Sequence, residues 1–191
     1  MNTRSRSRRP VLAVAAAALT VALALAGCAA APRGGADAIP TAAAAAGHVT
    51  PAPEAVRAPQ VHGTLVDGTE VELASLWTSR PLVVQFTATW CTQCADGEPA
   101  LRALADDYGD DLLVVHVALD EPADTIQKYL HDNDVVGPVI VDGTGSIWRD
   151  YAVAEPPVTA LIDTAGGIVK MWPGGATGDD LRSALEKIVT R

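Results

Sequence analysis

The stretch Trp90-Cys91-Thr92-Gln93-Cys94 lies where one pattern of apolar residues gives way to another. The run before it, residues 82–87, is short, apolar and β-branched, and it follows Pro81, which favours a buried strand. In the run after it, residues 98–108, apolar side chains recur three and four positions apart, which predicts a helix with one apolar face. The two cysteines are therefore expected where a strand passes into a helix.

The position of Cys91 near the start of that helix makes its sulfur a candidate nucleophile. Unpaired backbone N–H groups and the positive end of the helix dipole stabilise a thiolate there, which lowers the pKa of a cysteine. Cys94 lies about one helical turn further on and can reach the same sulfur. The pair is therefore predicted to be a redox-active dithiol.

Two other uses of this pair are a structural disulfide and half of a metal site. A disulfide across two intervening residues constrains little chain entropy, which argues against a purely structural role. Zinc would need two more ligands, but the only other cysteine in the sequence is Cys28. The four histidines show no ligand spacing: His48, His62, His116 and His131. We therefore expect redox chemistry without a metal or another cofactor.

The beginning of the chain has the layout of an export signal. Four arginines precede an apolar run over residues 11–26. The run closes in Leu25-Ala26-Gly27-Cys28, which resembles the lipobox of bacterial lipoproteins. That resemblance implies removal of residues 1–27 as a signal peptide and lipidation of Cys28 through its sulfur.

Two alternatives to lipidation lead to the same side of the membrane. Residues 24–26 also fit the small-residue site of an ordinary cleaved signal, and an uncleaved anchor is the other possibility. All three interpretations place the rest of the chain outside the cytoplasm. The lipoprotein interpretation places it on the outer face of the cytoplasmic membrane.

The charge and composition of the remaining chain divide it into two parts. The net charge is −9, and it becomes −13 when residues 1–27, with four arginines and no acidic residue, are removed. Such an acidic surface disfavours nucleic acid as a partner. Residues 28–57 are rich in Ala, Pro and Gly without apolar periodicity, which predicts a disordered tether. Residues 58–191 are long enough for a single domain with its own core.

The apolar patterns of that domain predict alternating strands and helices. Residues 63–66 and 70–73 flank the turn signal Asp67-Gly68, which predicts a hairpin. Residues 111–120 are a nearly continuous apolar run, typical of a central parallel strand. The later elements are expected to be a helix at 122–131, a strand at 138–141, a hairpin of 158–162 and 168–172, and a helix at 179–189. This order is typical of an α/β domain with a central mixed sheet flanked by helices and an N-terminal β-hairpin extension.

A Trp-Cys-x-x-Cys motif after the first core strand of such a domain resembles the thioredoxin fold. Residues 87–94, with Pro99 five positions after the second cysteine, are similar to the extracytoplasmic TlpA/ResA-type thiol–disulfide oxidoreductases. Residues 157–163 resemble the second signature of that family, whose proline is cis and faces the dithiol. Pro157 is the position that matches it, and the resemblance covers about residues 60–190.

The resemblance implies a mechanism, substrates and partners. The Cys91 thiolate attacks a substrate disulfide and Cys94 resolves the mixed disulfide, and in reverse the same chemistry oxidises substrate thiols. The implied substrates are exported proteins with cysteine pairs, such as apocytochrome c in cytochrome c maturation. A membrane electron-transfer partner resets the dithiol. Five residues are expected to contact the substrate: Trp90, Thr92, Gln93, Pro156 and Pro157.

The chain departs from the family pattern at three positions. Gln85 stands where thioredoxin has a buried aspartate, so that acid–base role is not carried over. Gly97 stands where many relatives have a glutamate. Glu98 follows one step later, about 100° further around the helix, and need not replace it. Pro156 has no N–H, although the family usually keeps one before the cis-proline.

Other conspicuous residues have simpler interpretations. His116, within an apolar run, is expected to be a buried histidine with a satisfied hydrogen bond rather than a base. Trp77, Trp148 and Trp172 are expected to be core or rim aromatics. Glu155 is either a solvated loop acid or a charge that raises the pKa values of the thiols.

Two other functions fit a dithiol in this fold. A copper(I) metallochaperone would use both thiolates as soft ligands. A thiol peroxidase is disfavoured because Ala88 lies three residues before Cys91, where a peroxidase needs a hydroxyl group. Copper binding without disulfide exchange would support the first alternative, and rapid consumption of peroxide would support the second.

Overall fold

The computed structural model describes residues 33–41, 48–52 and 54–190. The predicted signal peptide and the lipidation of Cys28 concern residues outside these ranges. The described residues form one compact unit. Among the described residues, the structure contains no helix that is long and apolar enough to cross a membrane.

A mixed sheet of eight strands, in the order β2-β9-β8-β5-β6-β7-β3-β4, forms the centre of this unit. Its strands are β2 (Val56–Arg57), β3 (His62–Leu65), β4 (Glu70–Glu72), β5 (Leu82–Thr87), β6 (Leu113–Leu119), β7 (Val139–Asp142), β8 (Val158–Ile162) and β9 (Gly167–Pro173). Strands β5, β6 and β7 run parallel, whereas β8 is antiparallel to β5 and β9 is antiparallel to β8. The expected mixed sheet is thereby confirmed.

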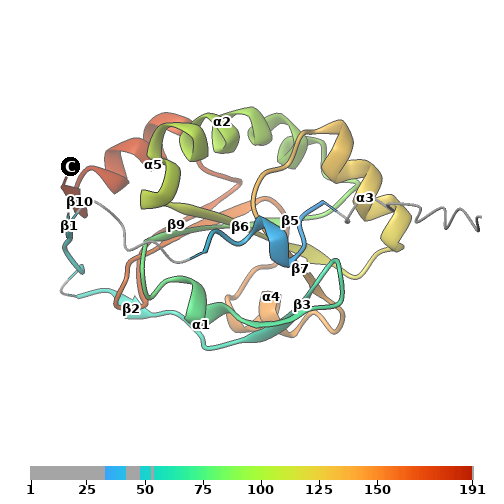
Figure 1. Ribbon diagram of the computed structural model, residues 1–191, viewed down its shortest axis with the longest axis horizontal. Helices are drawn as coiled ribbons and strands as arrows, with labels where there is room; N and C mark the ends of the chain where they lie inside the picture. The colour runs from blue at the N-terminus through green and yellow to red at the C-terminus, as the bar shows by residue number, and fades with distance from the viewer. Residues whose placement is uncertain (1–32, 42–47, 53, 191) are drawn as a thin grey trace, which may run out of the picture. The chain divides into compact units, whose positions relative to one another are not determined.

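Helices cover both faces of the sheet, because the central strands are apolar on both faces. All six residues of β5 are buried. On one side of β5, Val83 packs with residues of α2 (Thr92–Tyr108) and α5 (Gly178–Leu185). On the other side, Val84 and Phe86 pack with residues of α1 (Leu73–Leu76) and α4 (Ser146–Asp150). Figure 1 shows α2 and α5 on one side of the sheet and α1 and α4 on the other.

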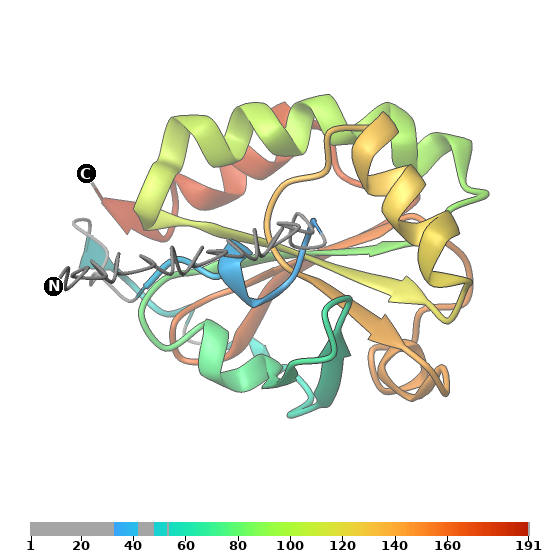
Figure 2. The ribbon, with the colours of Figure 1, turned by 45° about the vertical axis from the view of Figure 1, so that its right-hand side comes forward.

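On the same face as α2 and α5, α3 (Ala123–Asp132) packs against β6 and β7. Its buried residues Ile126, Tyr129 and Leu130 contact the same cluster as Val139 of β7. In the turned view, α2 and α5 run side by side along one face of the sheet (Figure 2). The face that carries Val83 is therefore covered by three helices.

The N-terminal hairpin forms as expected and extends the sheet at one edge. Strands β3 and β4 pair with His62 opposite Glu72, and β3 also pairs with β7. The last helix is shorter than the sequence indicated, since α5 ends at Leu185. The chain after it forms β10 (Val189–Thr190), which pairs with β1 (His48–Val49) in a separate two-stranded sheet.

The segment over residues 28–57, which was predicted to be a tether, contacts the rest of the domain at residues that the structure describes. Besides the pairing of β1, β2 pairs with β9 at the edge of the main sheet. Gly34 lies against β7, where its carbonyl oxygen accepts a hydrogen bond from Val139 N at 2.8 Å. A Cβ at Gly34 would overlap the Val139 side chain, and its φ of +86° also favours glycine. Glycine thus allows the backbone to approach the sheet here.

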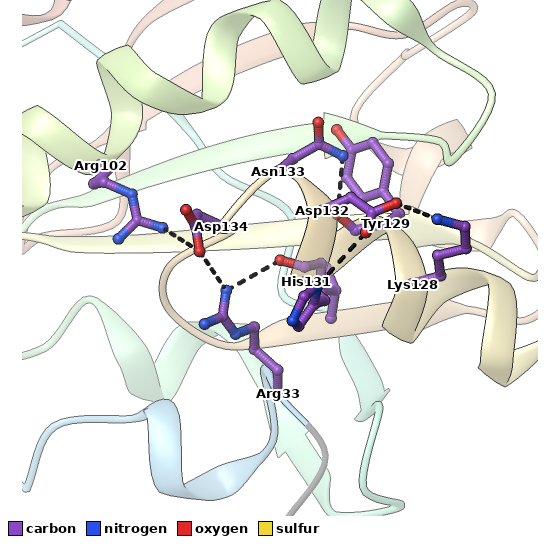
Figure 3. A network of polar contacts seen from close by, with 9 residues as sticks. Arg33, Arg102, Lys128, Tyr129, His131, Asp132, Asn133 and Asp134 are labelled. Carbon is purple, nitrogen blue, oxygen red and sulfur yellow. Dashed lines mark hydrogen bonds and ion pairs between the residues drawn. The ribbon is translucent and has the colours of Figure 1, made fainter.

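Arg33 fixes this N-terminal segment to α3. Its backbone N donates to Gln127 Oε1 at 3.0 Å, and Gln127 Nε2 donates to the Arg33 carbonyl oxygen at 3.1 Å. Its guanidinium donates to the carbonyl oxygen of Leu130 and pairs with Asp134, each at 3.2 Å (Figure 3). Arg102 of α2 also pairs with Asp134, at 3.7 Å. These hydrogen bonds and ion pairs hold Arg33 against the domain, although the composition of its segment favours disorder.

Candidate active site

Cys91 and Cys94 form a disulfide bond at the start of α2. Cys91 is the N-cap residue of this helix, and its sulfur accepts a hydrogen bond from Cys94 N at 3.1 Å. Cys91 is 6% exposed and Cys94 is 1% exposed. The predicted location of the dithiol between a strand and a helix is confirmed. Cys91 is slightly more exposed than Cys94.

The end of β5 and the start of α2 together position Cys91. After β5 ends at Thr87, the buried Ala88 begins a tight turn in which Cys91 N donates to the Ala88 carbonyl oxygen at 3.0 Å. The first turn of α2 contains no acidic residue. The positive end of the helix dipole is thus not offset there, which favours negative charge on the Cys91 sulfur.

The peptide bond between Pro156 and Pro157 is cis, as the family resemblance implied. The Pro157 carbonyl oxygen accepts a hydrogen bond from Gly174 N at 2.9 Å. The Gly174 carbonyl oxygen in turn accepts one from Gln93 Nε2, also at 2.9 Å. A side chain between the two cysteines is therefore tied to the loop that follows β9, and through it to the cis-proline.

A groove of about 390 Å³ lies beside this connection. Its lining includes Gln93, Glu155, Pro156, Pro157, Met171 and Gly174. Three of the five predicted substrate-contacting residues thus meet at one groove. The other two, Trp90 and Thr92, do not line it but flank Cys91 and are exposed, Trp90 to 66%. Glu155 is exposed at the groove, which brings an acidic charge to that surface.

Glu98, the acid one step after the position where many relatives have a glutamate, lies in the protein interior. It is 1% exposed, and its Oε2 lies 3.1 Å from Nε2 of His116, which is fully buried. Cys94, Glu98 and Leu101 are all buried residues of α2 and lie four and three positions apart. Glu98 therefore shares a helix face with Cys94, and that spacing is the signal that the sequence contained.

Further polar groups complete the surroundings of Glu98. The Tyr129 hydroxyl donates to Glu98 Oε1 at 3.5 Å and lies 3.2 Å from Thr87 Oγ1. Burial raises the pKa of Tyr129 to about 12, and the Glu98 charge adds to this effect. The hydrogen bond expected for His116 is present at Nε2. On the neighbouring strand β5, Gln85 is paired with His116. Gln85 Oε1 accepts a hydrogen bond from Thr159 Oγ1 at 2.6 Å.

The three tryptophans that were expected in the core or at its rim are buried: Trp77, Trp148 and Trp172. Among residues 33–41, 48–52 and 54–190, no group of three or more His, Cys, Asp or Glu side chains is arranged to hold a metal ion.

A cysteine pair at a helix start, tied to a cis-proline loop on a mixed sheet, defines a thioredoxin-like dithiol domain. Residues 55–171, more than half of the chain, match the AhpC/TSA family, and the chain belongs to that family. The thiol–disulfide oxidoreductase ResA of Geobacillus thermodenitrificans is 28% identical over 126 residues, covering 64% of this chain and 71% of that protein. The thioredoxin-like protein YneN of Bacillus subtilis is 28% identical over 110 residues, covering 56% and 64%.

Solved structures show the same similarity. The exposed lipoprotein thioredoxin Etrx1 of Streptococcus pneumoniae is 27% identical, with a TM-score of 0.59 over 68% of this chain and all of that one. A thiol:disulfide interchange protein DsbE of Chlorobium tepidum is 25% identical, with a TM-score of 0.63 over 70% and 95%. The expected thioredoxin-like fold is confirmed, and the protein is a thiol–disulfide oxidoreductase.

Proposed function

We propose that Cys91 is the attacking nucleophile and Cys94 the resolving cysteine of this exchange. The position of Cys91 as the N-cap of α2 carries the assignment, because it is the sulfur closest to the positive end of the helix. The Cys91 thiolate attacks a substrate disulfide, and one substrate sulfur leaves as a thiolate. Cys94 then attacks Cys91 Sγ, which releases the second substrate sulfur and leaves Cys91 and Cys94 oxidised.

The substrate chain binds along the exposed surface next to Cys91. The groove lined by Gln93, Pro156 and Pro157 supports this placement, since it is open and lies beside the start of α2. Trp90 supplies a large exposed aromatic surface next to the nucleophile. Thr92 is exposed at the first position of the helix. A substrate cysteine that reaches Cys91 passes between these two surfaces.

The substrates are exported proteins with cysteine pairs, and the domain is held on the outer face of the cytoplasmic membrane through lipidated Cys28. Leu25-Ala26-Gly27-Cys28 after an apolar segment supports this location. The similarity to a pneumococcal protein described as an exposed lipoprotein thioredoxin also supports it. A membrane electron-transfer partner resets the dithiol after each exchange. Apocytochrome c, with its closely spaced cysteines, is the substrate that the similarity to ResA and DsbE proteins favours.

Replacing the resolving cysteine tests the assigned roles. In the Cys94→Ala variant, Cys91 should form mixed disulfides with substrate proteins that are stable until a reducing agent is added. The Cys91→Ala variant is the matched control and should form none. Trapping through Cys94 in that control would reverse the two roles. Enrichment of proteins with cysteine pairs among the trapped partners is expected, and their absence would contradict the proposed substrate class.

Lipidation is tested separately by following the full chain in cells. Metabolic labelling with a fatty acid should label the wild type and place it in the membrane fraction. Cys28→Ala should remove the label and release the protein from that fraction. A labelled Cys28→Ala variant, or a wild type without label, would contradict the lipid anchor while leaving the exchange chemistry intact.

A further inference from the structure

Glu98 and His116 form an ionisable pair inside the protein, at 1% and 0% exposure. Their closest atoms, Oε2 and Nε2, are 3.1 Å apart. Removing ionisable groups from water is unfavourable, and well-packed apolar residues of similar size commonly replace such pairs without loss of stability. Stability alone therefore gives a weak explanation for the pair, and its location suggests a chemical role.

The acid of the pair lies one helical turn after the second cysteine. Glu98 follows Cys94 by four residues on α2, a spacing that brings the two Cβ atoms to about 5–6 Å on one helix face. Cys94 is 1% exposed, so bulk water has little access to its sulfur. A thiol in such a place needs a neighbouring group that can take its proton before it can act as a nucleophile.

The other groups around the pair are neutral. They are Tyr129 of α3, Thr87 and Gln85 of β5, and Thr159 of β8. Tyr129 keeps its proton at neutral pH because its pKa is raised to about 12. The groups here that can pass a proton between them are therefore Cys94, Glu98 and His116.

His116 has one nitrogen that is not used by this network. Within the described part of the chain, its Nδ1 is buried and has no hydrogen-bond partner. An imidazole that is hydrogen-bonded to a carboxylate through one nitrogen can carry a proton on either nitrogen. The pair thus has the capacity to hold one more proton without contact with solvent.

We propose that the Glu98–His116 pair accepts the proton of the Cys94 thiol when Cys94 resolves the mixed disulfide. The proposal rests on the roles assigned above to Cys91 and Cys94. The Cys94 S–H bond breaks and its proton moves to the pair. The Cys94 thiolate attacks Cys91 Sγ, the Cys91–Cys94 bond forms, and the substrate sulfur leaves with the electron pair of the broken bond. When the dithiol is reduced again, the pair returns one proton to Cys94.

The two chemical steps can be observed separately with dithiobis-nitrobenzoate, a chromogenic disulfide. The reduced full-length protein is mixed with one equivalent of this reagent. One coloured thiolate is released when Cys91 attacks the reagent, and a second is released when Cys94 resolves the mixed disulfide. Glu98→Gln keeps the shape of the side chain but cannot take a proton. We expect it to slow the second phase about a hundredfold at pH 7, the usual contribution of a positioned proton acceptor, and to change the first phase less than twofold.

Two further variants separate a proton-transfer role from a structural one. His116→Gln retains a nitrogen donor toward Glu98 and should also slow the second phase. Asp142→Asn is the control, because it removes the charge of another buried acid. Asp142 accepts a hydrogen bond from Trp148 N at 2.9 Å in a different part of the core, so this variant should leave both phases unchanged. Melting temperatures of all variants report any loss of structure. Equal slowing of both phases together with a lower melting temperature would indicate a structural role and overturn the proposal.

The wild type gives a test that does not depend on folding of a variant. With an internal proton acceptor, the rate of its second phase should level off by about pH 7, well below the value of about 8.5 at which a free thiol ionises. A rate that continues to rise tenfold per pH unit to about 8.5 would overturn the proposal. Loss of the second phase in Cys94→Ala tests the assigned cysteine roles independently, since that result does not involve the pair.

Discussion

Glu121 accepts two hydrogen bonds from Thr89, one from its backbone N at 2.9 Å and one from its hydroxyl group. Thr89 lies two residues before Cys91, and Glu121 follows the end of β6. The carboxylate therefore ties the chain before the nucleophile to a neighbouring strand of the sheet. This contact fixes where the first turn of α2 begins.

Replacing Glu121 with Ala should disturb the nucleophile without removing it. The backbone N–H and hydroxyl of Thr89 lose a charged acceptor, and hydrogen bonds to charged groups contribute about 1.5–3 kcal/mol when shielded from water. Because both side chains are only half-buried, we expect about 1 kcal/mol of destabilisation and a several-fold slower attack by Cys91. Urea unfolding and the first phase of the chromogenic assay measure the two effects. Asp120→Ala changes the exposed neighbouring acid and is the control. Identical behaviour of the two variants would contradict the role of Glu121.

Removing the side chain of Gln93 should weaken substrate binding more than chemistry. Gln93 loses its hydrogen bond to the Gly174 carbonyl oxygen, which connects α2 to one side of the groove. A neutral hydrogen bond of about 1 kcal/mol corresponds to roughly a fivefold effect. Gln93→Ala should therefore raise KM about fivefold for a peptide disulfide and leave the reaction with a small aromatic disulfide unchanged. Asp96→Ala, on an exposed part of the same helix, is the control. Equal effects on both substrates would contradict binding of a chain in the groove.

The local parts of this site could be predicted from sequence, because the signals are local. The mostly apolar run of β5 and the spacing of Leu101 and Leu104 in α2 locate the dithiol between a strand and a helix. The Glu98–His116 pair could not be predicted in the same way. It depends on how α2 is placed over β6, and charged residues are rarely buried, so composition points away from it.

The docking of residues 33–39 could not be predicted either, since its partners are distant in sequence. Arg33 is 94 residues from Gln127 and 101 residues from Asp134. Alanine, proline and glycine in this segment indicate disorder only when no such partner is available. Gly34 instead permits close contact with β7, which a pattern of hydrophobic residues does not reveal.

Docking of the N-terminal segment should protect the peptide bond after Arg33 from trypsin. Gln127→Ala removes both hydrogen bonds that join this side chain to the Arg33 backbone. Losing about 1–2 kcal/mol of local stability should accelerate cleavage after Arg33 about fivefold to thirtyfold. Thr125→Ala changes an exposed residue of α3 that bonds only to Asp124 among the contacts seen, and it should leave cleavage unchanged. If wild type and Gln127→Ala are cleaved equally fast, the segment is not docked.

Acid should release part of the same segment. The backbone N–H groups of Ala36 and Thr69 stabilise the Asp67 carboxylate and hold its pKa below the usual value of 3.8. A lowered pKa means that this contact contributes above pH 3.8 and is lost as the pH falls through the pKa of the folded protein. The amide resonance of Ala36, followed by NMR, should therefore titrate with a midpoint below 3.8 and should not titrate in Asp67→Asn. A midpoint at or above 3.8 would contradict the contact.

Turnover with a disulfide substrate tests the central claim most directly. Dithiothreitol-driven reduction of insulin disulfides should be accelerated by the wild type, and the single variants Cys91→Ala and Cys94→Ala should each lose that catalysis while remaining folded. The two residues that form the disulfide at the start of α2 would then both be required for exchange. Catalysis at the wild-type rate by either variant would contradict the assignment of this dithiol as the reacting centre.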